Sequence, residues 1–209
     1  MCGSASVTCW SPTRSKRKKR SLRRQIRASP ARTVLLALDE SDLLLLPPLR
    51  AGWALRGQPA PVPISGRNAR HTVFGSLNLR TGHALFLAQS HKRARNFQAF
   101  LHFIHEHYRG RSVALLLDEN SCHTAQGSLR LAHALGIQLL WLPKRSPHLN
   151  PVEHLWRHAK GVICANYQDA CLDHQVGSFI DHLQSLSAIQ RLRKAGVLSK
   201  KFWLRGVRH

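Results

Sequence analysis

Acidic residues are scarce in this sequence. Its 209 residues include 10 Asp and Glu against 32 Lys and Arg, which leaves a formal charge of +22 at pH 7. Such an excess of positive charge calls for a polyanionic partner, and nucleic acid is the usual one. Because 43% of the residues are hydrophobic, the chain can build a single sizeable core. A wholly disordered polybasic protein is therefore not expected.

Long apolar runs and paired cysteines are also missing. The best candidate run, residues 34–46, is interrupted by Asp39, Glu40 and Asp42, so neither a membrane span nor a secretory leader is expected. The cysteines are odd in number and lack a paired spacing, which indicates free thiols in a reducing compartment. They are Cys2, Cys9, Cys122, Cys164 and Cys171. No glycine-rich nucleotide motif occurs.

The positive charge is concentrated at the start of the chain. Residues 1–30 carry nine basic residues and no acid, whereas residues 31–209 keep a surplus of thirteen positive charges. Because KRKKRSLRRQIR at 16–27 has little apolar periodicity, we expect residues 1–30 to form a disordered arm and residues 31–209 the folded domain. The arm either binds DNA phosphates or is a solvated charge run. The candidate DNA contacts are Lys16, Arg17, Lys18, Lys19 and Arg20.

Short apolar runs and helical patterns alternate after residue 31. VLLALD at 34–39 and VALLLD at 113–118 are typical of strands buried on both faces. Further strands are predicted at 71–79 and 83–89, as a hairpin with Gly82 in its turn, and at 137–142. Helices are predicted at 94–108, 124–135, from Pro151 onward and around 172–193. The interleaving predicts an α/β fold with a mixed sheet flanked by helices.

Asp39 and Asp118 end the two apolar runs and are the first candidate site residues. If these runs are adjacent parallel strands, both carboxylates lie at the same edge of the sheet, where such folds bind ligands. Like charges held together repel, and a divalent metal such as Mg²⁺ would compensate them. The alternative is that each aspartate merely caps a turn. The repeated strand-and-aspartate pattern favours the metal site.

Glu153 is the third candidate. Asn150 is a good N-cap and Pro151 suits the first helical position, which places Glu153 third in the helix, near the positive end of the helix dipole. Glu at this position is also the second half of a capping box, and Arg157 lies four residues later for an ion pair. Together with two strand-end aspartates, a metal site for phosphoryl transfer is the better explanation.

Two blocks, LLLDENSCHT at 115–124 and LPKRSPHLNPVEHLWRHAK at 142–160, resemble bacterial insertion-sequence transposases related to the mariner superfamily. The 34 residues between Asp118 and Glu153 match the spacing of that superfamily's second and third acids. The segment ALDESDLLLLPPLRAGWALRGQP at 37–59 is similar to the family's first-aspartate segment. The resemblance covers about residues 33–205, and its P-x-LNP-x-E-HLW element is specific.

The resemblance implies a ribonuclease H-like fold and a DDE site formed by Asp39, Asp118 and Glu153. These residues would hold two Mg²⁺ or Mn²⁺ ions. One ion would help to deprotonate the attacking water or DNA 3′-hydroxyl, and the other would stabilise the leaving oxygen. The partner would be double-stranded DNA, as element ends and as a target, with insertion at a TA dinucleotide. Relatives act as multimers, so a homo-oligomer is expected, in a cytoplasmic, nucleoid-associated bacterial protein.

Several residues around the triad carry further expectations. His123 matches a family histidine and is treated, with Asn150, as adjacent to the site, where His123 could contact phosphate or orient a water. Lys144 and Arg145 would face the DNA backbone, although solvated surface charges are the alternative. Many relatives carry Asn and Asp where this chain has Glu119 and His148.

Other patterns are assigned structural roles. His154 and His158 are more consistent with a surface pair than with zinc ligands. Four tryptophans are expected to pack in the core or on the sheet rather than stack on bases: Trp53, Trp141, Trp156 and Trp203.

Two hypotheses follow. The first is a metal-dependent DDE transposase catalytic domain, acting as an endonuclease and polynucleotidyl transferase in DNA transposition. The second is a catalytically silent, truncated DNA-binding remnant, motivated by the lack of a helix-turn-helix pattern in residues 1–30. The missing module is either a separate helix-turn-helix polypeptide that supplies end recognition, or it has been lost and the chain is a truncated remnant.

Overall fold

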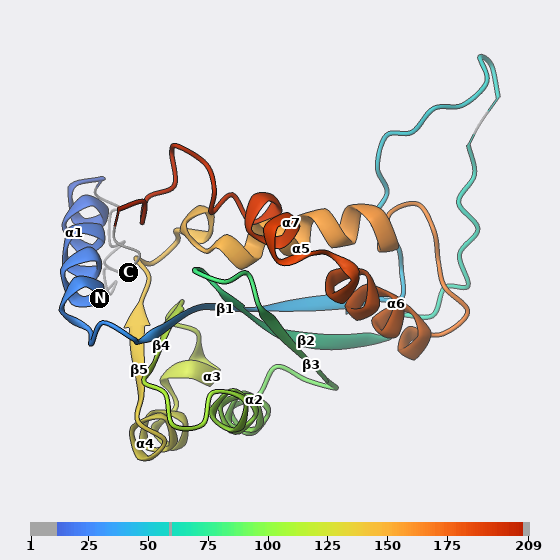
Figure 1. The fold of residues 1–209 in the computed structure, drawn as a ribbon. Helices are drawn as coiled ribbons and strands as arrows, with labels where there is room; N and C mark the ends of the chain where they lie inside the picture. Colours follow the sequence, from blue (N-terminus) through green and yellow to red (C-terminus); the bar gives the residue numbers. More distant parts are fainter. Residues whose placement is uncertain (1–11, 59, 207–209) are drawn as a thin grey trace, which may run out of the picture.

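The computed structural model describes residues 12–58 and 60–206 and is built around one five-stranded sheet (Figure 1). The strands are β1 (Val34–Leu44), β2 (Arg70–Asn78), β3 (Ala84–Gln89), β4 (Val113–Leu117) and β5 (Ile137–Trp141). Their order across the sheet is β3-β2-β1-β4-β5. β1 pairs antiparallel with β2 and parallel with β4, so the predicted mixed sheet is confirmed.

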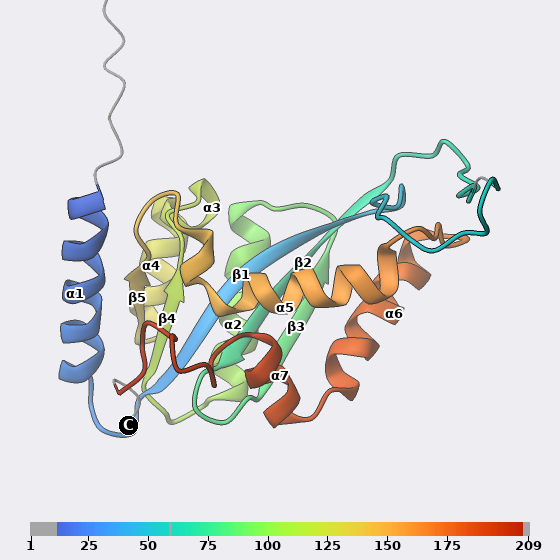
Figure 2. The same cartoon turned by 90° about the horizontal axis from the view of Figure 1, so that it is seen from above.

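Helices cover both faces of the sheet (Figure 2). One face carries α2 (Ala94–His107), α3 (Ser121–Thr124) and α4 (Gln126–Ala134). The other carries α5 (Pro151–Ala159), α6 (Leu172–Ser185) and α7 (Ala188–Lys194), with short turns η1 (Pro147–Leu149) and η2 (Lys160–Cys164) on either side of α5. Each face has its own buried apolar cluster, which explains why the central strands are apolar on both sides.

The alternation of side chains along β1 assigns its residues to the two faces. Leu36 and Leu38 belong to the cluster beneath α2, whereas Ala37 belongs to the cluster beneath α5. β1 continues well beyond the predicted end at residue 39, because residues up to Leu44 pair with β2. Asp39 therefore lies inside a strand, at the point where the parallel neighbour β4 ends.

The prediction that residues 1–30 are disordered is wrong for residues 12–28, which form helix α1 (Pro12–Ala28). Its Leu22 and Ile26, one helical turn apart, are buried in the cluster beneath α5. α1 lies beside β5 at the edge of the sheet (Figures 1 and 2), and Ser29 just after it donates a hydrogen bond to Gln138 of β5 at 3.2 Å. Residues 1–11 of the predicted arm, with Cys2 and Cys9, lie outside the described residues.

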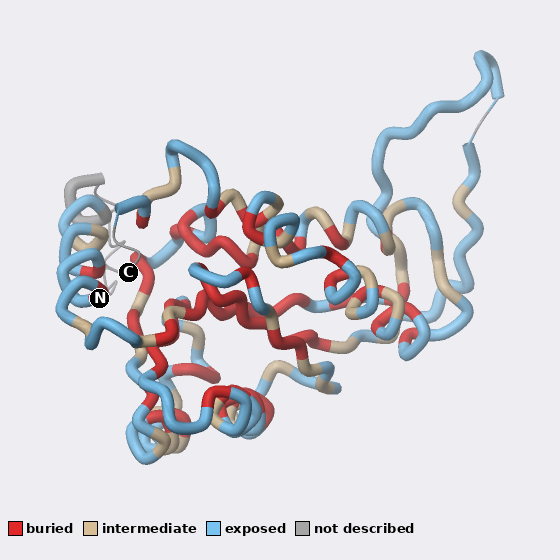
Figure 3. The backbone as a smooth tube through the Cα atoms, in the orientation of Figure 1, coloured by how far each residue is buried: buried red, intermediate tan, exposed pale blue. Residues whose placement is uncertain are grey.

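Two other predictions need correction. The helix predicted around 172–193 is divided before Ser187 into α6 and α7, whereas the helix predicted at 124–135 is present as α4, preceded by the short helix α3. Residues 46–58 and 60–69 belong to a mostly exposed loop that extends away from the sheet (Figure 3). Trp53 in this loop is fully exposed, so its predicted packing role is wrong.

The hairpin between β2 and β3 is confirmed, with Gly82 in its turn at a φ of 76°. At the opposite end of β2, the Leu45 N–H donates to the Ala69 carbonyl at 2.9 Å and closes the base of the exposed loop. No helix among residues 12–58 and 60–206 combines the length and apolar character needed to cross a membrane.

Candidate active site

Asp39 occupies a buried position on β1, with 8% of the residue exposed. It follows Leu38 in the alternation, so it faces the same side of the sheet as Ala37 and points toward α5. The next residue, Glu40, points to the opposite face, toward α2 and α3. The side chains of these two consecutive residues therefore lie on opposite faces of the sheet.

Asp118 stands just after β4 and is brought next to Asp39 by the parallel pairing. The register runs from Val34 opposite Val113 to Ala37 opposite Leu116, and each aspartate lies two residues beyond its strand's last pair. The Asp118 side chain is 54% exposed, so it is more accessible to solvent than the buried Asp39 beside it. The adjacency expected from the repeated strand-and-aspartate pattern is therefore present.

Glu153 reaches the same place from the start of α5. Asn150 caps this helix, with its side chain accepting from the Val152 N–H at 3.3 Å. The Asn150 amide also donates to the Leu38 carbonyl at 2.8 Å, which ties the helix start to β1 one residue before Asp39. Both groups of the Asn150 side chain are used in placing Glu153 beside the sheet.

The capping-box alternative for Glu153 is not realised in this geometry. The Asn150 N–H, which a capping box would offer to the glutamate, donates instead to the Pro147 carbonyl at 2.8 Å. The Glu153 carboxylate makes no hydrogen bond or ion pair with any residue that the structure describes, Arg157 included. Its oxygens are free for a ligand.

Close packing of α5 on the sheet depends on Gly75. This residue lies opposite Asp39 on β2, and a Cβ there would be 2.3 Å from Cη2 of Trp156. Trp156 is held between Phe86 and Phe179, with ring centroids 5.7 and 5.8 Å away. The absence of a side chain at residue 75 lets the Trp156 ring lie directly on the strand. As predicted, Trp156 is a packing residue.

The three carboxylates line a single cavity of about 300 Å³. Its wall is completed by Glu119 and by the loop between β5 and α5, including Lys144, Arg145 and Asn150. Lys144 is largely exposed and lies 3.5 Å from Glu119 through its ammonium group. The cavity therefore combines a negative floor with a basic rim, an arrangement that suits a phosphate backbone approaching bound cations.

The neighbouring carboxylates disfavour the charge of Asp39. Burial raises the pKa of Asp39 well above its ordinary value, and the negative charge of Glu153 adds to the rise. Glu40 and Asp118 act in the same direction, and Lys92 opposes them. In Asp118 the hydrogen bond from His123 lowers the pKa, against partial burial. A cation bound at this edge of the sheet would compensate the charge of Asp39.

Divalent ions fit these residues. Oδ2 of Asp39 is buried without a hydrogen-bond partner in the described chain, and the Glu153 carboxylate is equally free. Carboxylate oxygens are the ligands that Mg²⁺ and Mn²⁺ prefer, and a cation would supply the compensation that Asp39 lacks. The orphaned oxygen is the clearest sign that the cavity is shaped for a positive ligand.

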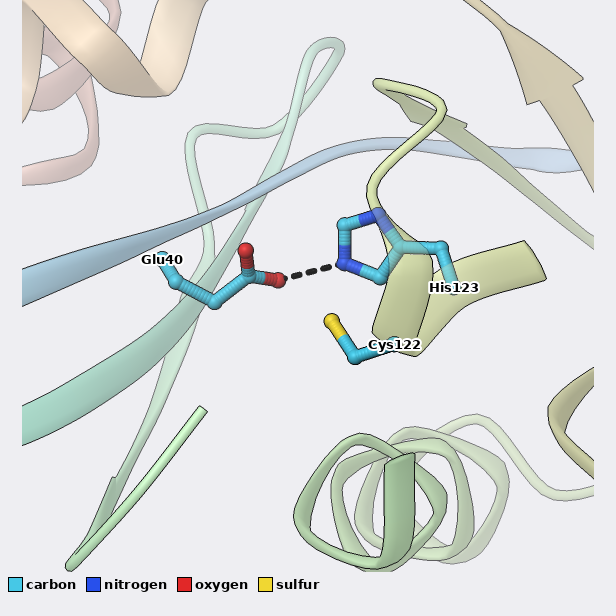
Figure 4. A group of neighbouring side chains, drawn as sticks. All are labelled: Glu40, Cys122 and His123. Carbon is cyan, nitrogen blue, oxygen red and sulfur yellow. Dashed lines mark hydrogen bonds and ion pairs between the residues drawn. The ribbon is translucent and has the colours of Figure 1, made fainter. Parts of the chain in front are cut away.

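His123 is fully buried, which excludes the predicted contact with DNA phosphate. Its Nε2 lies 2.6 Å from Oε1 of Glu40 (Figure 4). Its Nδ1 lies 3.0 Å from Oδ1 of Asp118. Burial alone would lower the pKa of His123, but hydrogen bonds to Asp118, Cys122 and Glu40 raise it to about 12. The imidazole is thus a buried contact of the Asp118 carboxylate and does not face the surface.

Glu40 contacts this histidine and is itself contacted by Lys92, and neither was predicted as a site residue. The Lys92 ammonium lies 2.7 Å from Oε2 of Glu40. The sequence does carry a signal for Glu40, since strand alternation places it opposite in direction to Asp39. Its partners are 52 and 83 residues away along the chain, and sequence patterns do not reveal such pairings.

The basic residues of α1 lie near the site without lining its cavity. Lys18 forms an ion pair with Glu119 at the cavity rim, and Arg23 donates to the Trp203 carbonyl at 2.7 Å. Lys16, Arg17 and Arg20 are exposed, whereas Lys18 and Lys19 are partly buried. Of the predicted DNA contacts in the described residues, Lys18 and Lys144 each form an ion pair with Glu119.

The histidine pair on α5 does not form a zinc site among the described residues. His158 pairs with His182 of α6, with 3.3 Å between their Nε2 atoms, and Lys194 lies 3.5 Å from its Nδ1. His154 takes no part. Trp141 and Trp203 are half-buried, and Nε1 of Trp203 donates to the Leu149 carbonyl at 2.9 Å, consistent with packing roles. Cys122, Cys164 and Cys171 are free thiols, as expected.

Comparison with known proteins gives one family. A family model described as DDE superfamily endonuclease matches residues 34–171. An insertion element IS630 uncharacterized 39 kDa protein from Shigella sonnei is 29% identical over 132 residues, covering 62% of this chain and 38% of that protein. The chain thus spans well under half the length of this curated relative.

Solved structures agree on the fold. The Mos1 transposase paired-end complex with left transposon end superposes with a TM-score of 0.69 at 15% identity, over 100% of this chain and 66% of that chain. The mariner Mos1 paired end complex with Mg gives 0.69 at 17% identity, over 99% and 66%. The catalytic domain of Mos1 mariner transposase gives 0.61 at 14% identity, over 90% and 89%. The ribonuclease H-like fold is confirmed.

Proposed function

Because the chain belongs to the DDE superfamily endonucleases, we propose that it is a transposase catalytic domain that cuts the ends of an insertion element and joins them to target DNA. The observation that carries this proposal is the meeting of three carboxylates in one cavity. Asp39, Asp118 and Glu153 come from three separate elements, in a chain with only 10 acids. A structural role for each would not require them to converge.

The chain's own residues would divide the work of holding two Mg²⁺ or Mn²⁺ ions. Asp39 would contribute its buried oxygen, which has no hydrogen-bond partner, and Asp118 would contribute a carboxylate that His123 orients. Glu153 would contribute a carboxylate that does not cap its helix. When bound, such ions activate an attacking hydroxyl and stabilise the leaving oxygen of an in-line displacement. Asn150 holds Glu153 against β1 throughout. The buried floor beneath Asp39 keeps competing water away from its inner oxygen.

The basic residues around the cavity would hold the DNA backbone. Lys144 and Arg145 stand on the rim, exposed, where phosphates flanking the scissile bond would pass. Lys16, Arg17, Lys19 and Arg20 of α1 extend this positive surface beyond Glu119. Lys18 contributes less, because its charge is already paired with Glu119. Contacts of this kind position DNA without reading its sequence.

Assembly and recognition complete the proposal. One of the Mos1 structures is a paired-end complex with a transposon end. By analogy this chain would act on double-stranded DNA as a homo-oligomer, with a TA dinucleotide as target. End recognition would come from a helix-turn-helix module, in a separate polypeptide or another part of the protein.

The test is nicking of a supercoiled plasmid carrying the element's ends, with a recognition polypeptide supplied in trans, in Mg²⁺ and in EDTA. The parent is expected to nick in Mg²⁺ alone. Asp118→Ala should lower the rate about 1000-fold, since a ligand to a catalytic ion is worth several kcal/mol. Asp181→Ala, which removes an exposed acid of α6, is the matched control and should keep the parent rate.

Equal nicking by the parent and Asp118→Ala would contradict the assignment of the triad. Salt-sensitive DNA binding by the parent with no metal-dependent nicking would support the catalytically silent remnant instead. The two results are distinct, because the first retains cleavage and the second never shows it.

A further inference from the structure

Glu40 is a buried carboxylate that the proposed chemistry leaves unused. Its side chain is 1% exposed, and it points away from the cavity lined by Asp39. A carboxylate in such a place is costly unless it is paired and hydrogen-bonded. Its two oxygens are both engaged, by His123 at 2.6 Å and by Lys92 at 2.7 Å.

His123 connects this carboxylate to the candidate metal site. Both partners of the imidazole are acceptors, since Nε2 faces Glu40 and Nδ1 faces the carboxylate and carbonyl oxygens of Asp118, each at 3.0 Å. The ring must therefore carry a proton on both nitrogens to satisfy both sides. Its ring packs on Phe97 of α2, with centroids 4.5 Å apart, which fixes its plane.

The effect reaches Asp118 because that side chain is otherwise weakly held. It stands just beyond the end of β4 and is half exposed, and its carboxylate is held by His123 and by a hydrogen bond from the Asn120 backbone. Groups that hold a metal-binding carboxylate or histidine in place tune the metal affinity, and losing one usually costs about 10- to 100-fold. A charged imidazole locked by Glu40 is well suited to that task.

The same residues suggest a different use, as a buried metal site. Among the residues the structure describes, Glu40, Cys122 and His123 form a group whose ligand atoms all lie within 4.8 Å of one another (Figure 4). Metal binding would require a deprotonated histidine and thiolate. The Lys92 ammonium already compensates Glu40, and the second nitrogen of His123 faces Asp118. A bound cation would face Lys92 at close range, so the ion pair is favoured.

We propose that Glu40 and Lys92 are positioning residues, which act through His123 to hold the Asp118 carboxylate in the orientation that binds a divalent ion. This inference rests on the proposed function, since it assumes that Asp118 is a metal ligand. It adds two residues from the opposite face of the sheet to the machinery of the site.

The experiment measures Mn²⁺ affinity directly, by the loss of the free-ion EPR signal on titration, together with urea unfolding of each variant. Glu40→Gln keeps the size and the acceptor oxygen but removes the charge, and it should raise the Mn²⁺ Kd about 10- to 100-fold. Lys92→Gln, at a partly exposed position, should act in the same direction with a smaller change.

Two controls separate positioning from general destabilisation. Ile104→Val weakens the same α2 core without touching the His123 contacts, so it should lower stability and leave the Mn²⁺ Kd unchanged. Glu106→Gln removes an exposed carboxylate of α2 and should change neither quantity. Asp118→Ala reports on the metal site itself and should lose high-affinity binding.

Parent-like Mn²⁺ affinity in a folded Glu40→Gln, with binding lost in Asp118→Ala, would overturn the positioning role and leave the proposed function intact. Mn²⁺ binding that is absent in the parent would defeat the proposed function, and this inference with it. Zn²⁺ bound by the parent and lost in Glu40→Gln, with Mn²⁺ affinity unchanged, would show that the cluster is a separate metal site and would also overturn the inference.

Discussion

Gly75→Ala tests how closely α5 must approach the sheet to place Glu153. The added Cβ would lie 2.3 Å from Cη2 and 2.6 Å from Cζ2 of Trp156, and 3.1 Å from Cδ1 of Phe86. These separations are far shorter than the spacing of about 3.5 Å at which carbon atoms attract. Trp156 cannot turn aside, because it is buried between Phe86 and Phe179. The helix must therefore lift from β2.

The expected cost of this overpacking is about 1–3 kcal/mol in the free energy of unfolding. Urea denaturation measures it, and the plasmid-nicking rate of the folded protein reports on the site. Glu153 lies one turn before Trp156 on α5, so the rate should fall at least about 10-fold while the variant remains folded. Gly177→Ala is the control. Gly177 lies within α6, and an added Cβ would meet no atom of another element within 4 Å, so the substitution should stabilise the protein by up to about 1 kcal/mol.

The double variant Gly75→Ala/Trp156→Phe sharpens the test. A phenyl ring lacks the far ring carbons of the indole, so the two changes should compensate and cost less together than their sum. Parent-like stability and rate in Gly75→Ala, or strictly additive costs in the double variant, would refute the close contact as the feature that sets the place of Glu153.

Three further outcomes are expected. The pKa of Asp39 is raised in the folded, metal-free protein. Above the ordinary aspartate pKa the unfolded chain has therefore lost a proton that the folded protein still holds. The free energy of unfolding falls as pH rises from the unfolded to the folded pKa. Asp39→Asn should remove this fall and weaken Mn²⁺ binding. In urea denaturation it should stabilise the metal-free protein at neutral pH by about 0.5–2 kcal/mol. A destabilised variant would contradict the idea that the buried Asp39 charge is unfavourable. Leu22→Ala should cost about 2–5 kcal/mol in urea denaturation if α1 packs as described, and a cost near zero would show that it does not. Lys16→Gln and Lys19→Gln should each reduce the magnitude of the slope of log affinity for duplex DNA against log salt by about 0.9, measured by fluorescence anisotropy. Lys18→Gln should reduce it less, because Lys18 is paired with Glu119. Equal changes in all three variants would show that this ion pair opens on binding.

Parts of the fold with local causes could be predicted from the sequence. Residues 34–39 and 113–118 are so apolar that only strands covered on both faces accommodate them, and their parallel pairing was the condition on which the nearness of Asp39 and Asp118 depended. The hairpin turn at Gly82 and the Asn150 cap depend on a few adjacent residues. Asp39, Asp118 and Glu153 could be named because the two aspartates directly follow apolar runs and Glu153 follows a helix cap, and these signals are local.

Features that depend on distant partners could not be predicted. α1 is stabilised by two apolar residues, Leu22 and Ile26, whose burial depends on the sheet edge and the end of the chain, while its charges alone suggest disorder. β1 continues through the polar residues 39–42 because β2 pairs with them. Glu40 owes its burial to His123 and Lys92, which neighbour it only in space.

Glu153→Gln is the measurement that tests the central claim most directly. Gln keeps the helix-capping ability of Glu at this position and nearly its shape, and removes only the charge that a divalent ion needs. In plasmid nicking with saturating Mg²⁺, we expect the folded variant to be about 1000-fold slower than the parent. A variant that nicks at the parent rate would show that the charge of Glu153 is not needed, and that the cavity of three carboxylates is not the catalytic site.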